Sequence, residues 1–206
     1  MAAATDVNRL DHIRRGQRLE YFTIAWNSVE ALVSIAAGLA AGSFSLLGFG
    51  LDSVIEVASG AAILWRLHHE GAERTTHRAV GISFLILAAY VTYGAVAALL
   101  RHEPPAESIL GIAIAAAAVI VMPLLARAKR RVAAGLRSAA MHSDSRQADF
   151  CMYLSAILLA GLLLNALLGW WWADPAAALL MVPIIAKEGI NGIRGEPCCN
   201  DCHCGS

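Results

Sequence analysis

Two acidic residues, Asp52 and Glu56, interrupt an otherwise apolar stretch of helix length that runs from Gly42 to Trp65. Such a stretch is expected to span a membrane, where an unpaired charge is costly. The spacing of four residues puts both carboxylates on one helix face, with their Cβ atoms roughly 6 Å apart. Two like charges in low dielectric repel each other unless a cation or a proton lies between them. The pair therefore favours a metal-binding site over a purely structural role.

The composition indicates an integral membrane protein, because 58% of the 206 residues are hydrophobic and only 16% are charged. Soluble domains contain about 25% charged residues. Most of the apolar segments are long enough to cross a hydrocarbon core of about 30 Å, and we expect Pro183 to interrupt the shortest, which is the last. The sequence predicts an all-α integral membrane protein whose six transmembrane helices correspond to residues 22–41, 44–65, 79–100, 108–126, 150–169 and 170–186.

The basic residues predict the orientation. Of the 16 Lys and Arg residues, all but Arg101 fall on the side of the predicted bundle that holds both termini. By the positive-inside rule that side is cytoplasmic, and the membrane is the plasma or inner membrane. We expect a cytoplasmic N-terminal segment at 1–20, a six-helix transporter domain at 21–190 and a cytoplasmic tail at 191–206.

The connections between the apolar segments are also informative. Residues 42–48 are expected to form a tight outer turn, and the alanine-rich residues 127–147 to extend two spans as helices on the inside. Basic residues 127–131 are explained as anchors that meet anionic lipid. Without aromatic interleaving or a fold signature, they indicate no nucleic-acid partner. Asp174 and Pro175 are expected to supply the N-cap and first-turn proline of the last helix.

A third acid, Glu30, lies in the first apolar segment at a depth that matches Glu56. Asn27 lies one turn before Glu30 and gives that helix a polar stripe. Glu30 is either a further ligand of the metal site or a protonated packing residue with hydrogen-bond partners, and its position is compatible with both.

The start of the fifth segment carries further candidate ligands. Gln147 and Cys151 are four residues apart and share a helix face, Asp144 lies one turn earlier, and Asp149 points away from that face. Thiolate, amide and carboxylate groups all bind metals, and sulfur shifts the preference toward zinc-like ions. A free cysteine in a helix is also a common packing residue.

Several of these motifs resemble those of the cation diffusion facilitator transporters. Residues 43–56 are similar to the second helix of that family, where an Asp-Ser-x-x-Asp pattern contributes half of a four-ligand intramembrane zinc site. Residues 143–155 and the Gly-Trp-Trp-Trp-Ala-Asp-Pro sequence at 169–175 resemble its fifth and sixth helices. These normally read Ala-Asp-x-x-His-x-x-x-Asp and then Gly-Trp-x-x-Ala-Asp-Pro. The resemblance extends over residues 15–190.

Carried over by position, the resemblance places the family's metal ligands at Asp52, Glu56, Gln147 and Cys151. The chain departs from the family pattern at three of these four positions, with Glu for Asp, Gln for His and Cys for Asp. The substrate ion is therefore open among zinc, which we expect first, iron, cobalt, cadmium and manganese. If the register of the fifth segment differs by two residues, Asp149 replaces Cys151.

The tail is unusually rich in metal-binding side chains. Family members commonly end in a cytoplasmic domain that binds metal and supports dimerisation, and we do not recognise one here, so a homodimer is only an expectation from the family. A dense Cys and His tract suggests metal capture, because cytoplasmic thiols stay reduced. The alternative is a disordered tail whose thiols have no specific role. The residues concerned are Cys198, Cys199, Cys202, His203 and Cys204.

The resemblance implies a secondary transporter that exports a divalent metal cation by proton antiport. We expect the empty site to hold at least one proton, which an incoming ion displaces because metals bind deprotonated ligands. The alternative is a membrane-embedded metal sensor or buffer that acts through the Cys-rich tail. An enzyme is not expected, because the sequence contains no nucleophile–base pair or metal-hydrolase spacing.

Overall fold

The computed structural model describes residues 2–66, 73–102, 105–136 and 139–194. This part of the chain is all-helical and contains no strand. Each helix is long and apolar enough to cross a membrane, which confirms the predicted fold class and the six spans. The helices are α1 (Ala2–Ala41), α2 (Phe44–Arg66), α3 (Glu73–Arg101), α4 (Ile109–Leu136), α5 (Ala139–Leu168) and α6 (Ala173–Arg194).

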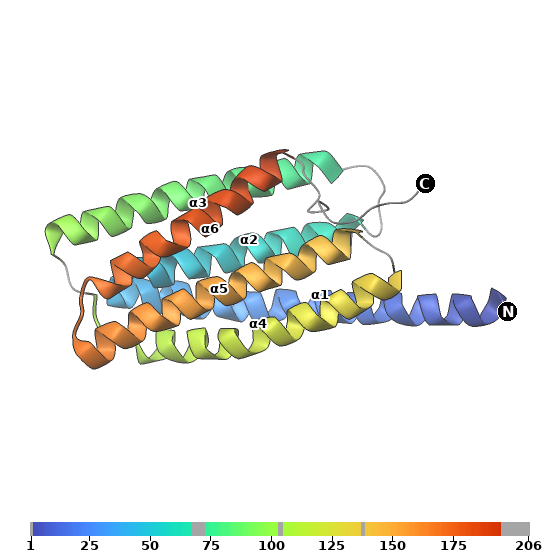
Figure 1. Ribbon diagram of the computed structural model, residues 1–206, viewed down its shortest axis with the longest axis horizontal. Coiled ribbons are helices and arrows are strands. Elements are labelled where there is room, and N and C mark those ends of the chain that lie inside the picture. The colour runs from blue at the N-terminus through green and yellow to red at the C-terminus, as the bar shows by residue number, and fades with distance from the viewer. Residues whose placement is uncertain (1, 67–72, 103–104, 137–138, 195–206) are drawn as a thin grey trace.

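The six helices run along a common long axis (Figure 1). Helices α3 and α6 lie side by side along one flank, and α1, α4 and α5 lie on the other side of α2. Helix α2 contacts α1, α3, α5 and α6. The two acids of α2 therefore lie in the most enclosed helix of the bundle.

The end of the bundle that carries the N-terminus also holds the ends of α2, α4 and α6 and the starts of α3 and α5 (Figure 1). Helix α4 ends at Leu136 and helix α5 begins at Ala139. The residues between the fourth and fifth spans are therefore mostly helical, as predicted. Residues 2–20 belong to the same continuous helix as the first span.

The sixth span differs from the prediction. We expected residues 170–186 with an interruption at Pro183, whereas α6 begins at Ala173 and continues through Pro183 to Arg194. Proline removes one backbone hydrogen bond, and transmembrane helices tolerate that loss when neighbouring groups compensate. The packing of α6 against α3 is very close, since a Cβ atom on Gly81 would lie 2.7 Å from the carbonyl oxygen of Gly189.

The outer turn and its cap also differ from the prediction. Helix α2 already begins at Phe44, so the turn is shorter than residues 42–48, and Gly42 makes it possible with a φ of +68°. Asp174 does not cap its own helix as expected. Its carboxylate accepts hydrogen bonds from the Ser43 hydroxyl at 2.6 Å, from the Phe44 N–H at 3.1 Å and from the Ser45 hydroxyl. Asp174 therefore fastens the N-terminus of α2 to α6, because this helix end offers unpaired N–H donors.

Candidate metal centre

Three side chains from two helices converge inside the bundle. Asp52 and Glu56 of α2 and Cys151 of α5 each offer one ligand atom, and these atoms lie within 4.8 Å of one another. The three residues are 3%, 7% and 0% exposed. Oxygen and sulfur donors gathered in this way can hold a divalent cation. The structure thus brings together three of the four side chains at which the family resemblance placed metal ligands.

The register of α5 separates the two alternatives for its second ligand. Asp149 lies on another face, where its Oδ2 atom is 2.5 Å from Nη1 of Arg130. Both side chains of this ion pair are partly exposed. Cys151, two residues further on, is the residue that faces Asp52 and Glu56.

A small cavity adjoins two of the three ligand candidates, Asp52 and Glu56. Its polar lining comes from Asp52, Glu56, Gln147 and Glu188, and the rest of the wall is apolar. Gln147 has no hydrogen-bond partner for its Nε2 atom within the described part of the chain. Its amide is therefore available to the cavity beside Glu56.

Glu188 of α6 is a cavity residue that the sequence interpretation missed. The predicted sixth span ended at residue 186, so Glu188 was placed just beyond the last span rather than in the membrane interior. The signal for its position was the spacing of Met181, Ile185 and Glu188, since residues three and four apart share a helix face. Both Met181 and Ile185 are buried.

Glu30 joins the edge of this site. Its Oε1 atom accepts a hydrogen bond from the Ser53 hydroxyl at 2.7 Å and lies 3.7 Å from Sγ of Cys151. Its other oxygen accepts a bond from the Trp26 indole at 2.8 Å. Glu30 is fully buried, and these contacts connect α1 to both helices that carry the ligand candidates.

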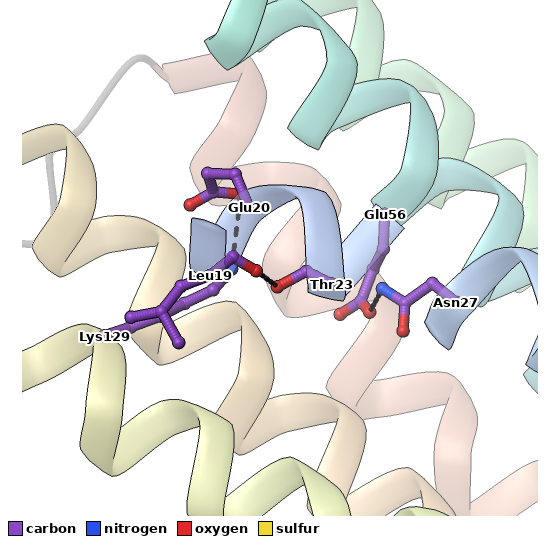
Figure 2. A network of polar contacts seen from close by, with 6 residues as sticks. All are labelled: Leu19, Glu20, Thr23, Asn27, Glu56 and Lys129. Carbon is purple, nitrogen blue, oxygen red and sulfur yellow. Dashed lines mark hydrogen bonds and ion pairs between the residues drawn. The ribbon is translucent and has the colours of Figure 1, made fainter. Parts of the chain in front are cut away.

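Asn27 holds one oxygen of Glu56. Its Nδ2 atom donates to Oε2 of Glu56 at 2.6 Å, from the helix that faces α2 (Figure 2). A hydrogen bond of this kind fixes the carboxylate rotamer, as partners of metal-binding side chains commonly do. The sequence had indicated only that Asn27 and Glu30 form a polar stripe.

A buried ion pair lies nearer the N-terminus of α1 than Asn27. Nζ of Lys129, on α4, is 3.4 Å from Oε2 of Glu20, and each side chain is 1% exposed (Figure 2). Lys129 is therefore an exception to the interpretation of residues 127–131 as lipid anchors, because its side chain faces the protein interior, whereas Arg127, Arg130 and Arg131 are exposed. No sequence pattern links two residues that lie 109 positions apart.

Two groups of predicted ligands cannot be placed. Asp144 belongs to α5, but its side chain lies outside the described residues. The tail ligands Cys198, Cys199, Cys202, His203 and Cys204 also lie outside them.

The chain is similar to several known proteins. Similar proteins include an uncharacterised transporter of Synechocystis sp., 29% identical over 72% of this chain and 56% of its own length. The cation-efflux pump FieF of Shewanella oneidensis is 29% identical over 54% of this chain and 36% of its length. Transmembrane protein 163 of Xenopus laevis is 26% identical over 84% of this chain and 64% of its length. The chain thus spans between about a third and two thirds of these relatives.

The family model that describes the cation efflux transmembrane domain matches residues 21–194. These residues include all six spans and every ligand candidate that the structure describes. The chain belongs to the cation efflux family.

Proposed function

We propose that this protein exports a divalent metal cation, zinc before the other candidates, in exchange for protons. The observation that carries the proposal is the convergence of Asp52, Glu56 and Cys151 inside a bundle of six apolar helices. A buried acid pair with a thiol is costly in a membrane unless a cation or protons neutralise it.

The geometry is close to that of a bound zinc ion. Zinc lies at roughly 2.0–2.3 Å from oxygen and sulfur ligands in tetrahedral sites, so neighbouring ligand atoms are about 3.5 Å apart. The present atoms lie within 4.8 Å of one another, and small side-chain rotations would close the site around an ion. Gln147, on the same cavity, is the fourth ligand in this proposal.

Proton exchange follows from the chemistry of the ligands. The thiol and at least one carboxyl must be deprotonated before they bind a metal. Loading therefore releases protons, and unloading on the other side takes protons up. The basic residues at the N-terminal end of the bundle support a cytoplasmic position for that end, so the metal moves outward as protons move inward.

Metal flux in reconstituted vesicles tests this function. Purified protein in liposomes should transport zinc when a pH gradient is imposed, and Asp52→Asn or Glu56→Gln should reduce the rate to the level of empty liposomes. Asp149→Asn is the matched control, because this acid pairs with Arg130 on an exposed face. Wild-type flux in both site variants would refute the ligand assignment.

A further inference from the structure

The cavities of the bundle lie away from one of its ends. One small cavity adjoins Asp52 and Glu56, and another adjoins Glu56. We call the end opposite the N-terminus the distal end (Figure 1). Asp52 is the lining residue closest to the distal end of its own helix, and it still lies about 12 Å along α2 from the first residue, Phe44. The space around the candidate centre therefore belongs to the middle of the bundle and to its N-terminal half.

The Asp174 clasp, which Asp174 forms with Ser43, Phe44 and Ser45, closes the distal end between α2 and α6. The carboxylate accepts hydrogen bonds from both serine hydroxyls and from the Phe44 N–H. Asp174 is 1% exposed, and both serines are 0% exposed. Loss of any of these donors would leave a buried carboxylate unsatisfied, which is costly. The two helices can therefore separate at this end only if water replaces the three donors.

Two further hydrogen bonds connect the other helices at the distal end. The Ala106 N–H donates to the carbonyl oxygen of Ala41, at the end of α1, at 2.7 Å. Nδ2 of Asn165, on α5, donates to the carbonyl oxygen of Pro105 at 3.2 Å. Pro105 and Ala106 shortly precede α4, so the polar contacts at this end reach beyond the two helices of the clasp.

A layer of apolar side chains separates the clasp from the candidate centre. Leu46 and Phe49 lie between Ser45 and Asp52 on α2, and both are 0% exposed. The packing is close, since a Cβ atom on Gly111 of α4 would lie 2.7 Å from Cδ2 of Leu46. A cation does not enter such a layer without water, because the loss of hydration is too costly. An ion that moves from Asp52 toward the distal end therefore requires the helices to part.

We propose that the Asp174 clasp is the outer gate of the transporter. While the clasp is closed, the centre is shut off from the distal end and exchanges ions with the cytoplasmic side. When the clasp breaks, α2 and α6 part at this end, water replaces the three donors of Asp174, and the ion is released outward. The opening is reversible, because a hydrogen bond contributes little net free energy when water takes its place. This inference rests on the proposed function and assigns Asp174, Ser43 and Ser45 a role in the transport cycle.

Thiol labelling from each side of the membrane tests the gate. Ala178→Cys reports on the distal end, because Ala178 lies one turn from Asp174 on α6 and is 0% exposed. Ala148→Cys reports on the N-terminal half, because Ala148 lines the second cavity. Membrane vesicles of both orientations that contain the full-length protein are treated, without added metal, with an uncharged maleimide that carries a sugar group and does not cross the membrane. Mass spectrometry of the peptide that contains each reporter gives its labelling rate.

Weakening of the clasp should open the distal end alone. Asp174→Asn should raise the rate at the Ala178→Cys reporter from the distal side by about tenfold, because an amide offers one acceptor oxygen to the three donors. Ser45→Ala removes one donor and keeps the carboxylate, so it should raise this rate by about threefold without changing the charge near the thiol. Glu107→Gln, at an exposed position near the same end, is the matched control and should stay within about twofold of the parent.

The second reporter distinguishes a gate from a loosened fold. Labelling of Ala148→Cys from the N-terminal side should change by less than about twofold in every variant, because a minor open state takes little population from the closed one. A comparable rise at both reporters would overturn the inference, and so would unchanged rates at the distal reporter in both Asp174→Asn and Ser45→Ala. Ser45→Ala keeps the test valid if Asp174→Asn does not fold. Because the assay contains no added metal, its result is distinct from zinc flux, in which wild-type rates for Asp52→Asn would refute the metal centre instead.

Discussion

At the scale of single residues, the candidate centre combines two carboxylates with one thiol. Cys151 is fully buried and lies against Asp52, Glu56 and Glu30. Sulfur ligands favour zinc-like and other soft ions, whereas carboxylates and water suit magnesium, calcium and manganese. Position 151 therefore sets the balance between softer and harder divalent ions in this account.

Substitution of Cys151 tests that role. Cys151→Ser should weaken zinc binding by about tenfold or more and remove the part of the cobalt thiolate charge-transfer absorption that comes from this residue. Cys151→Asp should retain binding and shift the preference from cadmium toward manganese. Absorption titrations of the full-length protein with Co²⁺ measure the first effect, and isothermal titration calorimetry with Cd²⁺ and Mn²⁺ measures the second. An unchanged absorption spectrum in Cys151→Ser would exclude the thiol as a ligand.

Asn27 provides a second test at this scale. Because its amide holds Oε2 of Glu56 at 2.6 Å, Asn27→Leu should lower zinc affinity by roughly 10–100-fold, as is common for residues that orient a metal ligand. Asn27→Gln, which retains an amide donor, should recover part of the loss. The control is Ser28→Ala, because the Ser28 hydroxyl donates a hydrogen bond to the backbone oxygen of Ile24 on its own helix. Equal affinities in Asn27→Leu and the wild type would contradict the orienting role.

At the scale of helices, the bundle is held together by contacts that fix α2. The N-terminus of α2 is bonded to Asp174 of α6, and its middle is bonded to Glu30 and Asn27 of α1. Because α2 carries two of the ligand candidates, its axial position determines whether they meet Cys151. The α6 contact therefore belongs to the architecture of the site, although it lies at the far end of the helix.

Removal of that contact should be visible in stability. Asp174→Ala eliminates three hydrogen bonds to a buried carboxylate, and an intramolecular hydrogen bond contributes about 0.5–1.5 kcal/mol net to stability. We expect the free energy of unfolding to fall by about 2–4 kcal/mol. Thermal unfolding followed by tryptophan fluorescence measures the change, and Glu107→Gln, at an exposed position near the same end, is the control. Equal midpoints for Asp174→Ala and Glu107→Gln would contradict the clasp between α2 and α6.

At the scale of the whole molecule, local patterns predicted the fold and the central acids. Hydropathy runs located six helices, and the spacing of Asp52 and Glu56 needed only the geometry of one helix. The choice between Asp149 and Cys151 as the ligand on α5 needed the structure, because the sequence allowed either residue. Glu188 and the partners of Lys129 and Asp174 were missed because each depends on a contact between helices that are distant in the chain.

Proton release is the prediction that belongs to the whole transporter. Zinc binding to the purified protein in weakly buffered solution should release at least one proton per ion, because the ligands must be deprotonated to bind. Titrations in two buffers of different ionisation enthalpy give the number of protons released. The Asp52→Asn variant should show neither binding heat nor proton release at the centre. Zinc binding by the wild type with no accompanying proton release would contradict the antiport mechanism.

Anomalous scattering at the zinc absorption edge would show whether one divalent ion binds among Asp52, Glu56 and Cys151. Crystals of the zinc-loaded protein should show a peak enclosed by these three side chains, at about 2.3 Å from Sγ of Cys151 and about 2.0–2.2 Å from one oxygen of each carboxylate. The same data from Asp52→Asn crystals should lack that peak. A zinc-loaded wild-type protein with no anomalous density between α2 and α5 would show that zinc does not bind at these three side chains.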